Sequence, residues 1–296
     1  MSGIPSEDAS RHTGAACLGA PKLPESGQQM PVPDDSVSVS LRCFGVGDGW
    51  PCDDRRHSAY LYRFGTTRLL VDCGDGFSQS YKASGLSYEA LDGILLTHMH
   101  SDHVGGFSMF LQGLWLERRT RPLTVAAPAA GISALQAWLA ATLLSPDLFG
   151  FPIRWLPLVA GQPVEVGDVI VEPARTGHLD SLRAKLALRF PEACFEALAF
   201  GLSGLGRRVV HSGDIGAPAD LEPLLEQPLD LLTCELSHVE LTELTALLRR
   251  RRIRRAVFIH LGRELWADRS GTQRRLEAEL PETEVRVPVD GDEVMA

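Results

Sequence analysis

Four side chains of metal-binding type lie within six residues of this chain, directly after apolar residues 94–96: His98, His100, Asp102 and His103. Imidazole and carboxylate groups are the ligands that zinc, iron and manganese take in proteins. Alternate residues of an extended segment point the same way, so His98 and His100 can bind one ion. Asp102 and His103 lie past the bend and can face a second ion. The alternative is a polar loop without a ligand, but the crowding of these groups predicts a metal site.

Three further candidate ligands each follow an apolar run that is typical of a β-strand: His178, Asp214 and His260. Taken singly, a histidine after a strand is more often a packed or surface residue than a ligand. Together with the clustered residues they make a set of seven, about the number that two adjacent ions need when each keeps one position for water. We therefore interpret all of them as parts of one site.

The rest of the chain alternates predicted strands with predicted helices. Strands are expected at residues 36–41, 58–64, 67–72, 124–127, 153–158, 169–173, 207–212, 229–233 and 256–259, with a tight hairpin at Gly65 and Thr66. Helices are expected at residues 104–116, 132–144 and 240–250, the first of them apolar nearly all round and therefore buried. Because the candidate ligands follow strand ends, this pattern indicates a layered α/β domain with its site on loops at one edge of the sheets.

Charge and composition limit the partners and the compartment. The net charge is −9, so the chain as a whole does not attract nucleic acid or an anionic membrane. Its longest apolar runs are too short for a transmembrane helix, and its N-terminus lacks the pattern of a secretory signal. The six cysteines form no C-x-x-C pair, which favours reduced thiols in a cytoplasmic protein.

The chain begins with a segment that differs in composition from the rest. Residues 1–35 are rich in Ser, Gly, Pro and Gln without sustained periodicity, so they cannot bury enough apolar surface to offset the entropy of ordering. We expect a disordered tail over residues 1–35 and a single domain, which carries all the candidate metal ligands, over residues 36–296.

The candidate ligands also occur in the order of a known family. The pattern His98-x-His100-x-Asp102-His103, followed by His178, Asp214 and His260, resembles the metallo-β-lactamase superfamily of metal-dependent hydrolases. The resemblance runs from about residue 41 to about residue 262. It implies a four-layer αββα sandwich with the metal ions at the edge between the two sheets.

The resemblance also implies a role for each ligand. One ion would be held by His98, His100 and His178, and the other by Asp102, His103 and His260. Asp214 would bridge the two ions. Asp72, which follows a predicted strand, would support the histidine loop by hydrogen bonding; the alternative for Asp72 is an ordinary aspartate of a turn.

Two neighbouring divalent ions imply a hydrolytic mechanism. A metal-bridging hydroxide would be the nucleophile, and the ions would stabilise oxyanion charge. Asp102 could take the proton of the attacking water as a general base. Zinc is the default ion for such a site, with iron or manganese as alternatives. The substrate class is an ester, thioester, amide or phosphodiester.

Three shorter motifs resemble those of the ribonuclease Z-like and phosphodiesterase branch of the superfamily. The motifs are Ser212-Gly213-Asp214, the stretch of residues 230–235, and Gly45-x-Gly47-Asp48. Members of that branch usually carry His-Glu-Ala-Thr after the Asp-Leu-Leu strand, and here Cys234 holds the position of that histidine. His238 is the candidate substitute as a catalytic residue; the alternative is a surface or supporting histidine.

The branch leaves the size of the substrate open. Ribonuclease Z proteins often insert a basic arm that grips tRNA, and residues 126–173, before His178, contain none. A cyclic nucleotide or short nucleotide ester is therefore as good a candidate as RNA. The basic run of residues 249–255 is either a phosphate-binding patch or a helix end whose arginines complement the helix dipole. Trp50 either forms a wall of the substrate pocket or caps the core.

The leading hypothesis is a dinuclear metal-dependent phosphodiesterase, and two alternatives stay beside it. A thioester or lactone hydrolase of the same fold would use the same ligands. A non-catalytic metal-binding module is the third possibility, although a structural site has no need for two ions and an open water position. Nucleic acid is a possible partner, no membrane partner is expected, and a homodimer is the commonest assembly for a protein of this kind.

Overall fold

Two seven-stranded β-sheets form the centre of residues 38–296, the part of the chain that this computed structural model describes. The strands of the first sheet are, in spatial order, β14 (Glu293–Met295), β1 (Val39–Gly45), β2 (Ala59–Phe64), β3 (Thr67–Val71), β4 (Gly93–Leu95), β5 (Leu123–Pro128) and β6 (Ile153–Leu158). Those of the second sheet are β13 (Glu284–Arg286), β12 (Ile253–Leu261), β11 (Leu229–Leu236), β10 (Arg207–His211), β9 (Ala197–Gly204), β8 (Val169–Thr176) and β7 (Val164–Val166). Alternate apolar side chains of both sheets, such as Tyr62 and Phe200, share one buried core.

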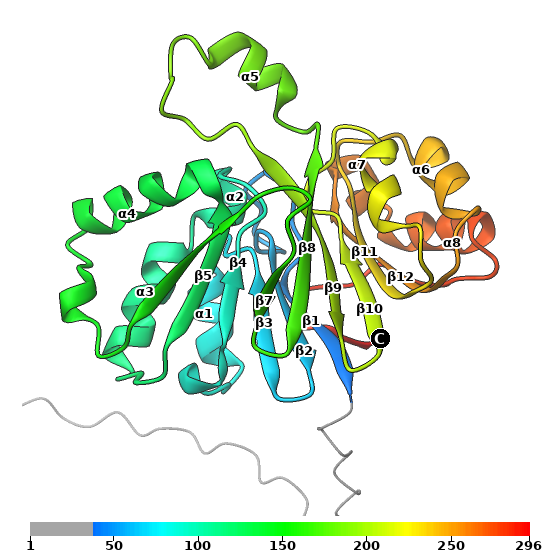
Figure 1. The fold of residues 1–296 in the computed structure, drawn as a ribbon. Coiled ribbons are helices and arrows are strands. Elements are labelled where there is room, and N and C mark those ends of the chain that lie inside the picture. Colours follow the sequence, from blue (N-terminus) through cyan, green and yellow to red (C-terminus); the bar gives the residue numbers. More distant parts are fainter. Residues whose placement is uncertain (1–37) are drawn as a thin grey trace, which may run out of the picture. The chain divides into compact units, whose positions relative to one another are not determined.

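Helices cover the outer face of each sheet (Figure 1). The α-helices are α1 (Phe77–Ala83), α2 (Ser101–Val104), α3 (Phe107–Leu116), α4 (Ile132–Ala141), α5 (Asp180–Leu186), α6 (Leu241–Leu248), α7 (Arg263–Ala267) and α8 (Arg269–Glu279). The 3₁₀ turns are η1 (Tyr88–Ala90), η2 (Ala129–Gly131), η3 (Pro146–Leu148) and η4 (Pro218–Leu224). Helices α1, α3 and α4 pack on the first sheet and α6 and α8 on the second, each over its own apolar core. The predicted four-layer αββα sandwich is therefore confirmed.

Strand direction brings the site loops together. In the first sheet β3, β4, β5 and β6 are parallel, and in the second sheet β10, β11, β12 and β13 are parallel. The carboxyl ends of parallel strands meet at one edge of a sheet, where loops are free to carry functional groups. The candidate ligands lie at such ends: the histidine loop follows β4, Asp214 follows β10, and His260 is near the end of β12.

The predicted hairpin is confirmed. Strands β2 and β3 pair antiparallel with Phe64 opposite Thr67, so only Gly65 and Thr66 connect them. Gly65 has a φ of 56°, a left-handed conformation that glycine adopts without steric cost. The first predicted strand is shifted: it begins at Val39 and runs to Gly45, and Ser36 and Val37 lie outside the described residues, as does the predicted tail of residues 1–35.

The single buried helix predicted over residues 104–116 is wrong in two respects. The structure has α2 and α3, separated by Gly105 and Gly106, because the backbone of Gly106 packs so tightly that a Cβ there would lie 2.3 Å from the carbonyl oxygen of Gly74. One side of α3 also faces solvent: Met109 is 54% exposed and Leu116 is 62% exposed. The helix lies on the outside of the first sheet, so only one side of it can be buried.

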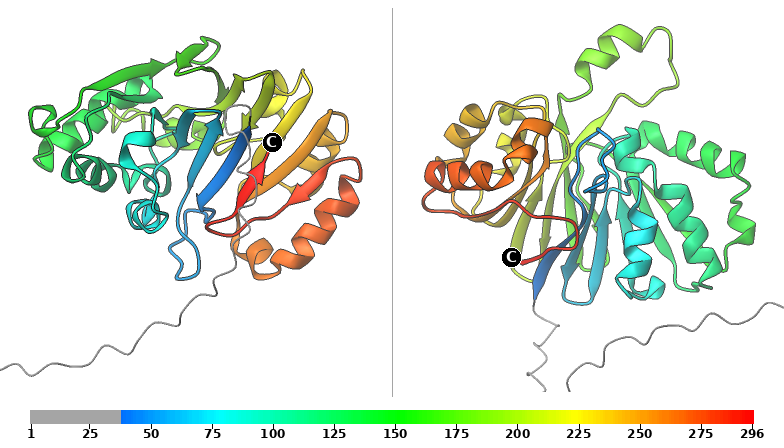
Figure 2. Two further views of the ribbon diagram at one scale, coloured as in Figure 1. Left: turned by 90° about the horizontal axis from the view of Figure 1, so that it is seen from below. Right: turned by 180° about the vertical axis from the view of Figure 1, so that it is seen from behind.

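Several elements have no counterpart among the predicted ones. They include α5, α7, α8, β9 and the C-terminal strand β14, which pairs with β1 at the edge of the first sheet. Figure 2 shows that α5 and its flanking loops project from the sandwich. Within residues 38–296, no helix combines the length and apolar character that crossing a membrane requires.

Candidate metal centre

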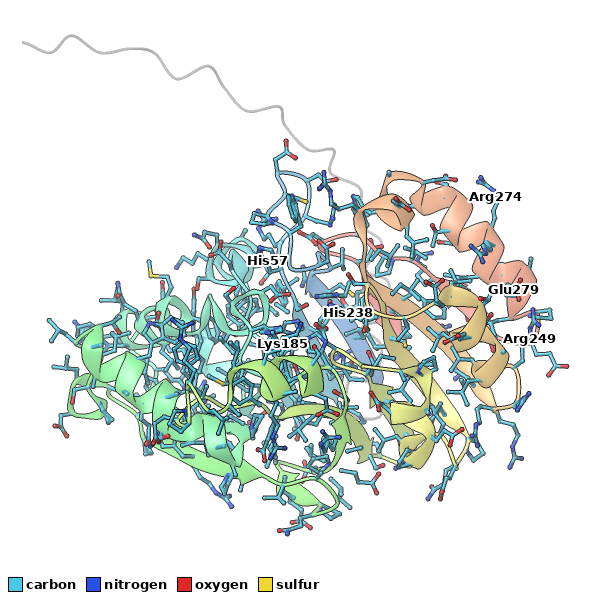
Figure 3. The ribbon with its side chains drawn as sticks, turned by 90° about the horizontal axis from the view of Figure 1, so that it is seen from above. His57, Lys185, His238, Arg249, Arg274 and Glu279 are labelled. Carbon is cyan, nitrogen blue, oxygen red and sulfur yellow. The ribbon has the colours of Figure 1, made fainter. Side chains whose placement is uncertain are left out.

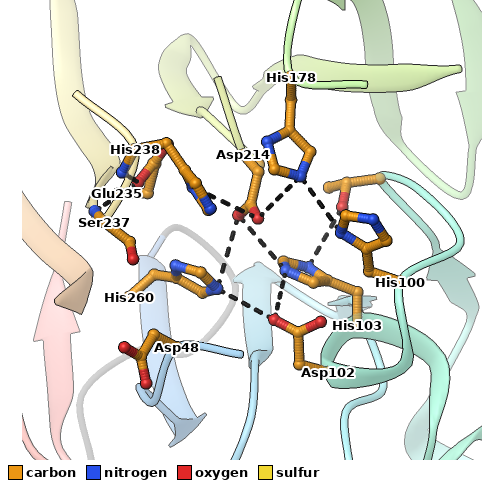
Figure 4. A network of polar contacts seen from close by, with 12 residues as sticks. Asp48, His100, Asp102, His103, His178, Asp214, Glu235, Ser237, His238 and His260 are labelled. Carbon is orange, nitrogen blue, oxygen red and sulfur yellow. Dashed lines mark hydrogen bonds and ion pairs between the residues drawn. The ribbon is translucent and has the colours of Figure 1, made fainter. Parts of the chain in front are cut away.

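Asp214 stands between two groups of side chains (Figure 4). Its Oδ2 lies 3.8 Å from Nε2 of His98 and 3.5 Å from Nε2 of His178. Its Oδ1 lies 3.3 Å from Nε2 of His103 and 3.7 Å from Nε2 of His260. Each carboxylate oxygen therefore faces its own pair of imidazoles, which is the arrangement that a bridging ligand requires.

The remaining two predicted ligands complete these groups. His100 joins the first, with its Nδ1 3.2 Å from Nε2 of His178. Asp102 joins the second, with its Oδ2 3.2 Å from Nε2 of His260 and 3.4 Å from Nε2 of His103. In each group the four candidate ligand atoms, one of them from Asp214, lie within 4.8 Å of one another. The structure thus brings all seven residues together, and their binding of metal stays a prediction.

The donor atoms fit divalent metal ions. Nε2 of His98, Nε2 of His103 and Oδ1 of Asp214 are buried and have no hydrogen-bond partner among the described residues. Buried polar atoms are normally paired, because leaving one unpaired costs free energy. These three atoms point into the space that the seven residues surround, and nitrogen and carboxylate donors in that number suit zinc, iron or manganese.

The ionisation of the first group also fits metal binding. Burial lowers the pKa of His98 and His100, and it lowers the pKa of His178 to about 4. These imidazoles are therefore neutral near pH 7, the form in which histidine binds a metal ion.

The second group shows where positive charge is favoured. Burial opposes a charge on His103 and His260, but Asp214 and other nearby carboxylates raise the pKa of both imidazoles. Burial likewise opposes a charge on Asp214, and His260 and His103 nevertheless hold its pKa well below the usual range. The same carboxylates that favour a proton on these imidazoles favour a divalent cation between them.

Asp72 fixes the histidine loop from behind. It directly follows β3, and its carboxylate accepts hydrogen bonds from the backbone N–H of Thr97 at 2.8 Å and from Nδ1 of His103 at 2.7 Å. The hydroxyl of Thr97 contacts both Asp72 and Nδ1 of His98. Because Nδ1 of His103 is engaged with Asp72, Nε2 is left to face Asp214. The predicted support by Asp72 is confirmed.

Close packing of the backbone presents Asp214. The preceding residue, Gly213, has a φ of 53°, and a Cβ there would lie 2.7 Å from the carbonyl oxygen of Leu198. Only glycine combines this left-handed conformation with such a close approach. His260 itself has a φ of 51°, and its backbone N–H donates at 2.9 Å to the carbonyl oxygen of Val46, which directly follows β1 of the other sheet. Non-glycine residues in this conformation are uncommon and cluster at functional sites.

His238 lies beside the centre and is held by Glu235. The Glu235 carboxylate accepts hydrogen bonds from the backbone N–H groups of Ile215, Ser237 and His238. Nδ1 of His238 lies 3.2 Å from Oε1 of Glu235 and 3.7 Å from Oδ2 of Asp214. Burial opposes a charge on His238, but the hydrogen bond and the charge of Glu235 raise its pKa. The His238 side chain is still 36% exposed, so it borders both the centre and solvent.

Glu235 has no role in the sequence prediction, although a signal exists. It is an acidic residue at the end of an apolar strand, three positions before His238. Cys234, its neighbour on β11, points the opposite way into the apolar core beneath α6 and α8. Burial raises the pKa of its thiol. Cys234 belongs to none of the candidate ligand groups among the described residues, whereas Glu235 and His238 form a third group with His260.

The basic run of residues 249–255 lies away from the centre. Arg249 pairs with Glu279, Arg251 with Glu222 and Arg255 with Glu284. Figure 3 shows Arg249 and Glu279 at the outer side of α6 and α8, far from His238. These contacts favour the structural interpretation of the run over a phosphate-binding patch.

A projecting segment follows His178 directly. Residues 179–196 leave the sandwich, carry α5 and return as β9 (Figures 1 and 2). Their tip, residues 181–191, contains Arg183, Lys185 and Arg189 and no acidic residue. Leu188 is fully exposed there. The projection as a whole is neutral, because Asp180, Glu192 and Glu196 offset these three basic residues, so only its tip is basic.

Comparison with known proteins identifies the family. A family profile described as beta-lactamase superfamily domain matches residues 67–261, which is well over half of the chain. The chain therefore belongs to the metallo-β-lactamase superfamily, as its motifs predict.

Ribonuclease Z proteins are among its sequence relatives. That of Bradyrhizobium sp. (strain ORS 278) is 33% identical over 137 residues, 46% of this chain and 45% of the relative. That of Salinibacter ruber is 31% identical over 146 residues, 48% of this chain and 44% of the relative. The match thus spans less than half the length of these curated relatives.

Solved structures share the fold. The metallo-β-lactamase fold protein YhfI from Bacillus subtilis has a TM-score of 0.69 at 18% identity, over 88% of this chain and all of that one (100%). The short form of human tRNase Z has a TM-score of 0.63 at 17% identity, over 86% of this chain and 98% of that one. At such identities the likeness shows the fold alone.

Loss of one Asp72 contact should weaken metal binding. In Asp72→Asn one acceptor oxygen becomes a donor, so either Thr97 or His103 loses its partner. Asn tolerates the φ of 59° at this position, so no backbone strain is added. We expect zinc affinity, measured by competition with a chromophoric chelator, to fall roughly 10- to 100-fold. The exposed Asp75, in the same turn, supplies the control Asp75→Asn, which should leave affinity unchanged. Equal affinity of both variants and the unsubstituted protein would contradict the supporting role.

Proposed function

We propose that this protein is a dinuclear metal-dependent hydrolase that acts on phosphodiesters. Membership of the metallo-β-lactamase superfamily supports the metal-dependent hydrolysis. Sequence relatives named ribonuclease Z support a phosphoryl substrate. The observation that carries the proposal is the position of His238 beside Asp214, because it adds a proton donor to a set of metal ligands.

The seven ligands would divide as the two groups around Asp214 suggest. His98, His100 and His178 would hold one ion, Asp102, His103 and His260 the other, and Asp214 would bridge them. When bound, two divalent ions supply an acidified water as the nucleophile and positive charge for the phosphoryl oxygens. Zinc is our first choice, with iron or manganese as alternatives, because nitrogen and carboxylate donors suit all three.

His238 would donate a proton to the leaving group. Its raised pKa keeps it protonated in a larger share of molecules near neutral pH, and Glu235 holds the ring through Nδ1. Nε2 is then the atom that can donate. An alkoxide leaving from a phosphodiester is strongly basic and needs this proton, whereas a thiolate leaving from a thioester needs it far less. The dyad of His238 and Glu235 therefore favours the phosphodiester over the thioester alternative.

Asp102 fits the role of a ligand better than that of a base. Burial opposes its charge, but hydrogen bonds from His103 and His260 hold its pKa well below the usual range. A carboxylate with so low a pKa is a poor proton acceptor near pH 7. Proton uptake by Asp102 stays a prediction that a bound ion, by changing the charges around it, would modify.

RNA and a smaller phosphodiester are both candidate substrates. The basic tip of residues 181–191 follows His178, so it could attract phosphates beyond the scissile one. The tip carries three basic residues within a chain of net charge −9, so this attraction is local. A homodimer and a cytoplasmic location likewise stay proposals.

The proposed activity has a direct test. We expect purified protein with added zinc or manganese to hydrolyse bis(p-nitrophenyl) phosphate, and chelation to abolish turnover reversibly. His100→Ala removes one ligand and should lower kcat at least about 100-fold, with the folded state checked by circular dichroism. Metal-replete protein with no turnover above that of His100→Ala would contradict the phosphodiesterase assignment.

The role of His238 has a separate test based on the leaving group. Thymidylyl-thymidine releases a basic alkoxide, and the p-nitrophenyl ester of thymidine 5′-phosphate releases a weakly basic phenolate. We expect His238→Ala to lower kcat roughly 100-fold or more on the dinucleotide and less than about 10-fold on the nitrophenyl ester. Ser237→Ala is the matched control, since Ser237 contributes only its backbone N–H to Glu235. Equal losses on both substrates would exclude proton donation to the leaving group.

A further inference from the structure

Trp50 is a large aromatic side chain held in an exposed position. It is 57% exposed, although its loop is firmly anchored. Asp48, which is buried, accepts a hydrogen bond from the backbone N–H of Trp50 at 3.3 Å and forms an ion pair with Arg55 at 3.2 Å. The carbonyl oxygen of Asp48 is 2.7 Å from Nδ1 of His57. These contacts hold the loop, which places an indole in water instead of in the core.

Two reciprocal cation–π pairs join this loop to α7. The guanidinium of Arg55 lies 4.7 Å from the ring centroid of Trp266, and that of Arg263 lies 4.6 Å from the ring centroid of Trp50. The first pair is structural: Trp266 packs against the apolar cores, its indole N–H donates to Asp54 at 2.8 Å, and Arg55 is buried.

The second pair, of Arg263 and Trp50, still has polar groups that can bind a ligand. Within residues 38–296, no carboxylate forms an ion pair with Arg263, and the indole N–H of Trp50 donates no hydrogen bond. Both side chains are exposed, whereas Arg55 is buried. A pair that only clamped the loop to α7 would gain nothing from this exposure, because the pair of Trp266 and Arg55 already makes that contact.

The exposed pair lies next to the metal centre. Gly49, the neighbour of Trp50, packs so closely on Asp102 that a Cβ there would lie 3.3 Å from its carboxylate. Arg263 is three residues beyond His260, at the start of α7. Both residues are therefore tied to the second ligand group, and Figure 4 shows Asp48 beside His260 on this side of the centre.

We propose that Trp50 and Arg263 form a subsite for a planar aromatic ring of the substrate, namely the nucleobase of a nucleotide phosphodiester. The base stacks on the indole face opposite Arg263, and the N–H groups at the edge of the Arg263 guanidinium donate to the anionic oxygens of the substrate. Indole faces stack with any base and are therefore tolerant of sequence, and an unpaired arginine adds attraction for phosphate. This subsite rests on the proposed phosphodiesterase function and adds the class of substrate.

Two substrates with the same leaving group test the subsite. The p-nitrophenyl ester of thymidine 5′-phosphate carries a base, and methyl p-nitrophenyl phosphate does not. We expect Trp50→Leu to lower kcat/KM roughly 10-fold on the thymidine substrate, mainly through KM, and less than 2-fold on the methyl substrate. Trp50→Phe should restore most of the difference. Arg263→Met should raise KM for the thymidine substrate as well, and Leu116→Ala, an exposed residue of α3, should change neither.

A binding measurement separates the subsite from the chemistry. Adenosine 5′-monophosphate should quench the fluorescence of the unsubstituted protein and not that of Trp50→Leu, and ribose 5-phosphate should quench neither. Turnover of neither substrate by the unsubstituted protein, with quenching retained, would overturn the phosphodiesterase function alone. Two results would overturn the subsite. In the first, the protein turns over both substrates and Trp50→Leu does not change its preference between them. In the second, adenosine 5′-monophosphate still quenches the fluorescence of Trp50→Leu.

Discussion

A buried carboxylate between two groups of imidazoles is the constraint on which the rest of this site depends. Asp214 is almost fully buried, and its two oxygens face different histidines at 3.3 to 3.8 Å. A buried charge without opposite charge around it is strongly destabilising, so this carboxylate requires cationic partners. Divalent ions would meet that requirement, and they would also bind the unpaired nitrogens of His98 and His103.

Each of the two sheets contributes residues to the site around this carboxylate. The first sheet supplies the histidine loop, which Asp72 and Thr97 hold by hydrogen bonds. The second supplies Asp214, His238 and His260 from the ends of three neighbouring strands. Backbone hydrogen bonds from Leu198 to Thr97 and from His260 to Val46 tie the two halves together. Loops on a rigid double sheet can therefore hold many polar groups at fixed distances.

The sequence predicts the parts of this arrangement that local pattern encodes. The spacing of His98, His100, Asp102 and His103 is a local signal, and so is the hairpin at Gly65. The break between α2 and α3 is not, because it arises from the contact of Gly106 with the distant Gly74. The partnership of Glu235 with His238 depends on three backbone N–H groups that only the folded strand end gathers. The pairing of Trp50 with Arg263 joins segments more than 200 residues apart, which no local pattern can reveal.

The number of metal ions bound per chain decides whether the Asp214 cluster binds two divalent ions. Protein stripped with a chelator and dialysed would be titrated with zinc in a calorimeter, and the bound metal counted by elemental analysis after gel filtration. We expect about two equivalents of zinc per chain, because seven ligands are about the number that two ions require. One equivalent or none in a protein that circular dichroism shows to be folded would contradict it.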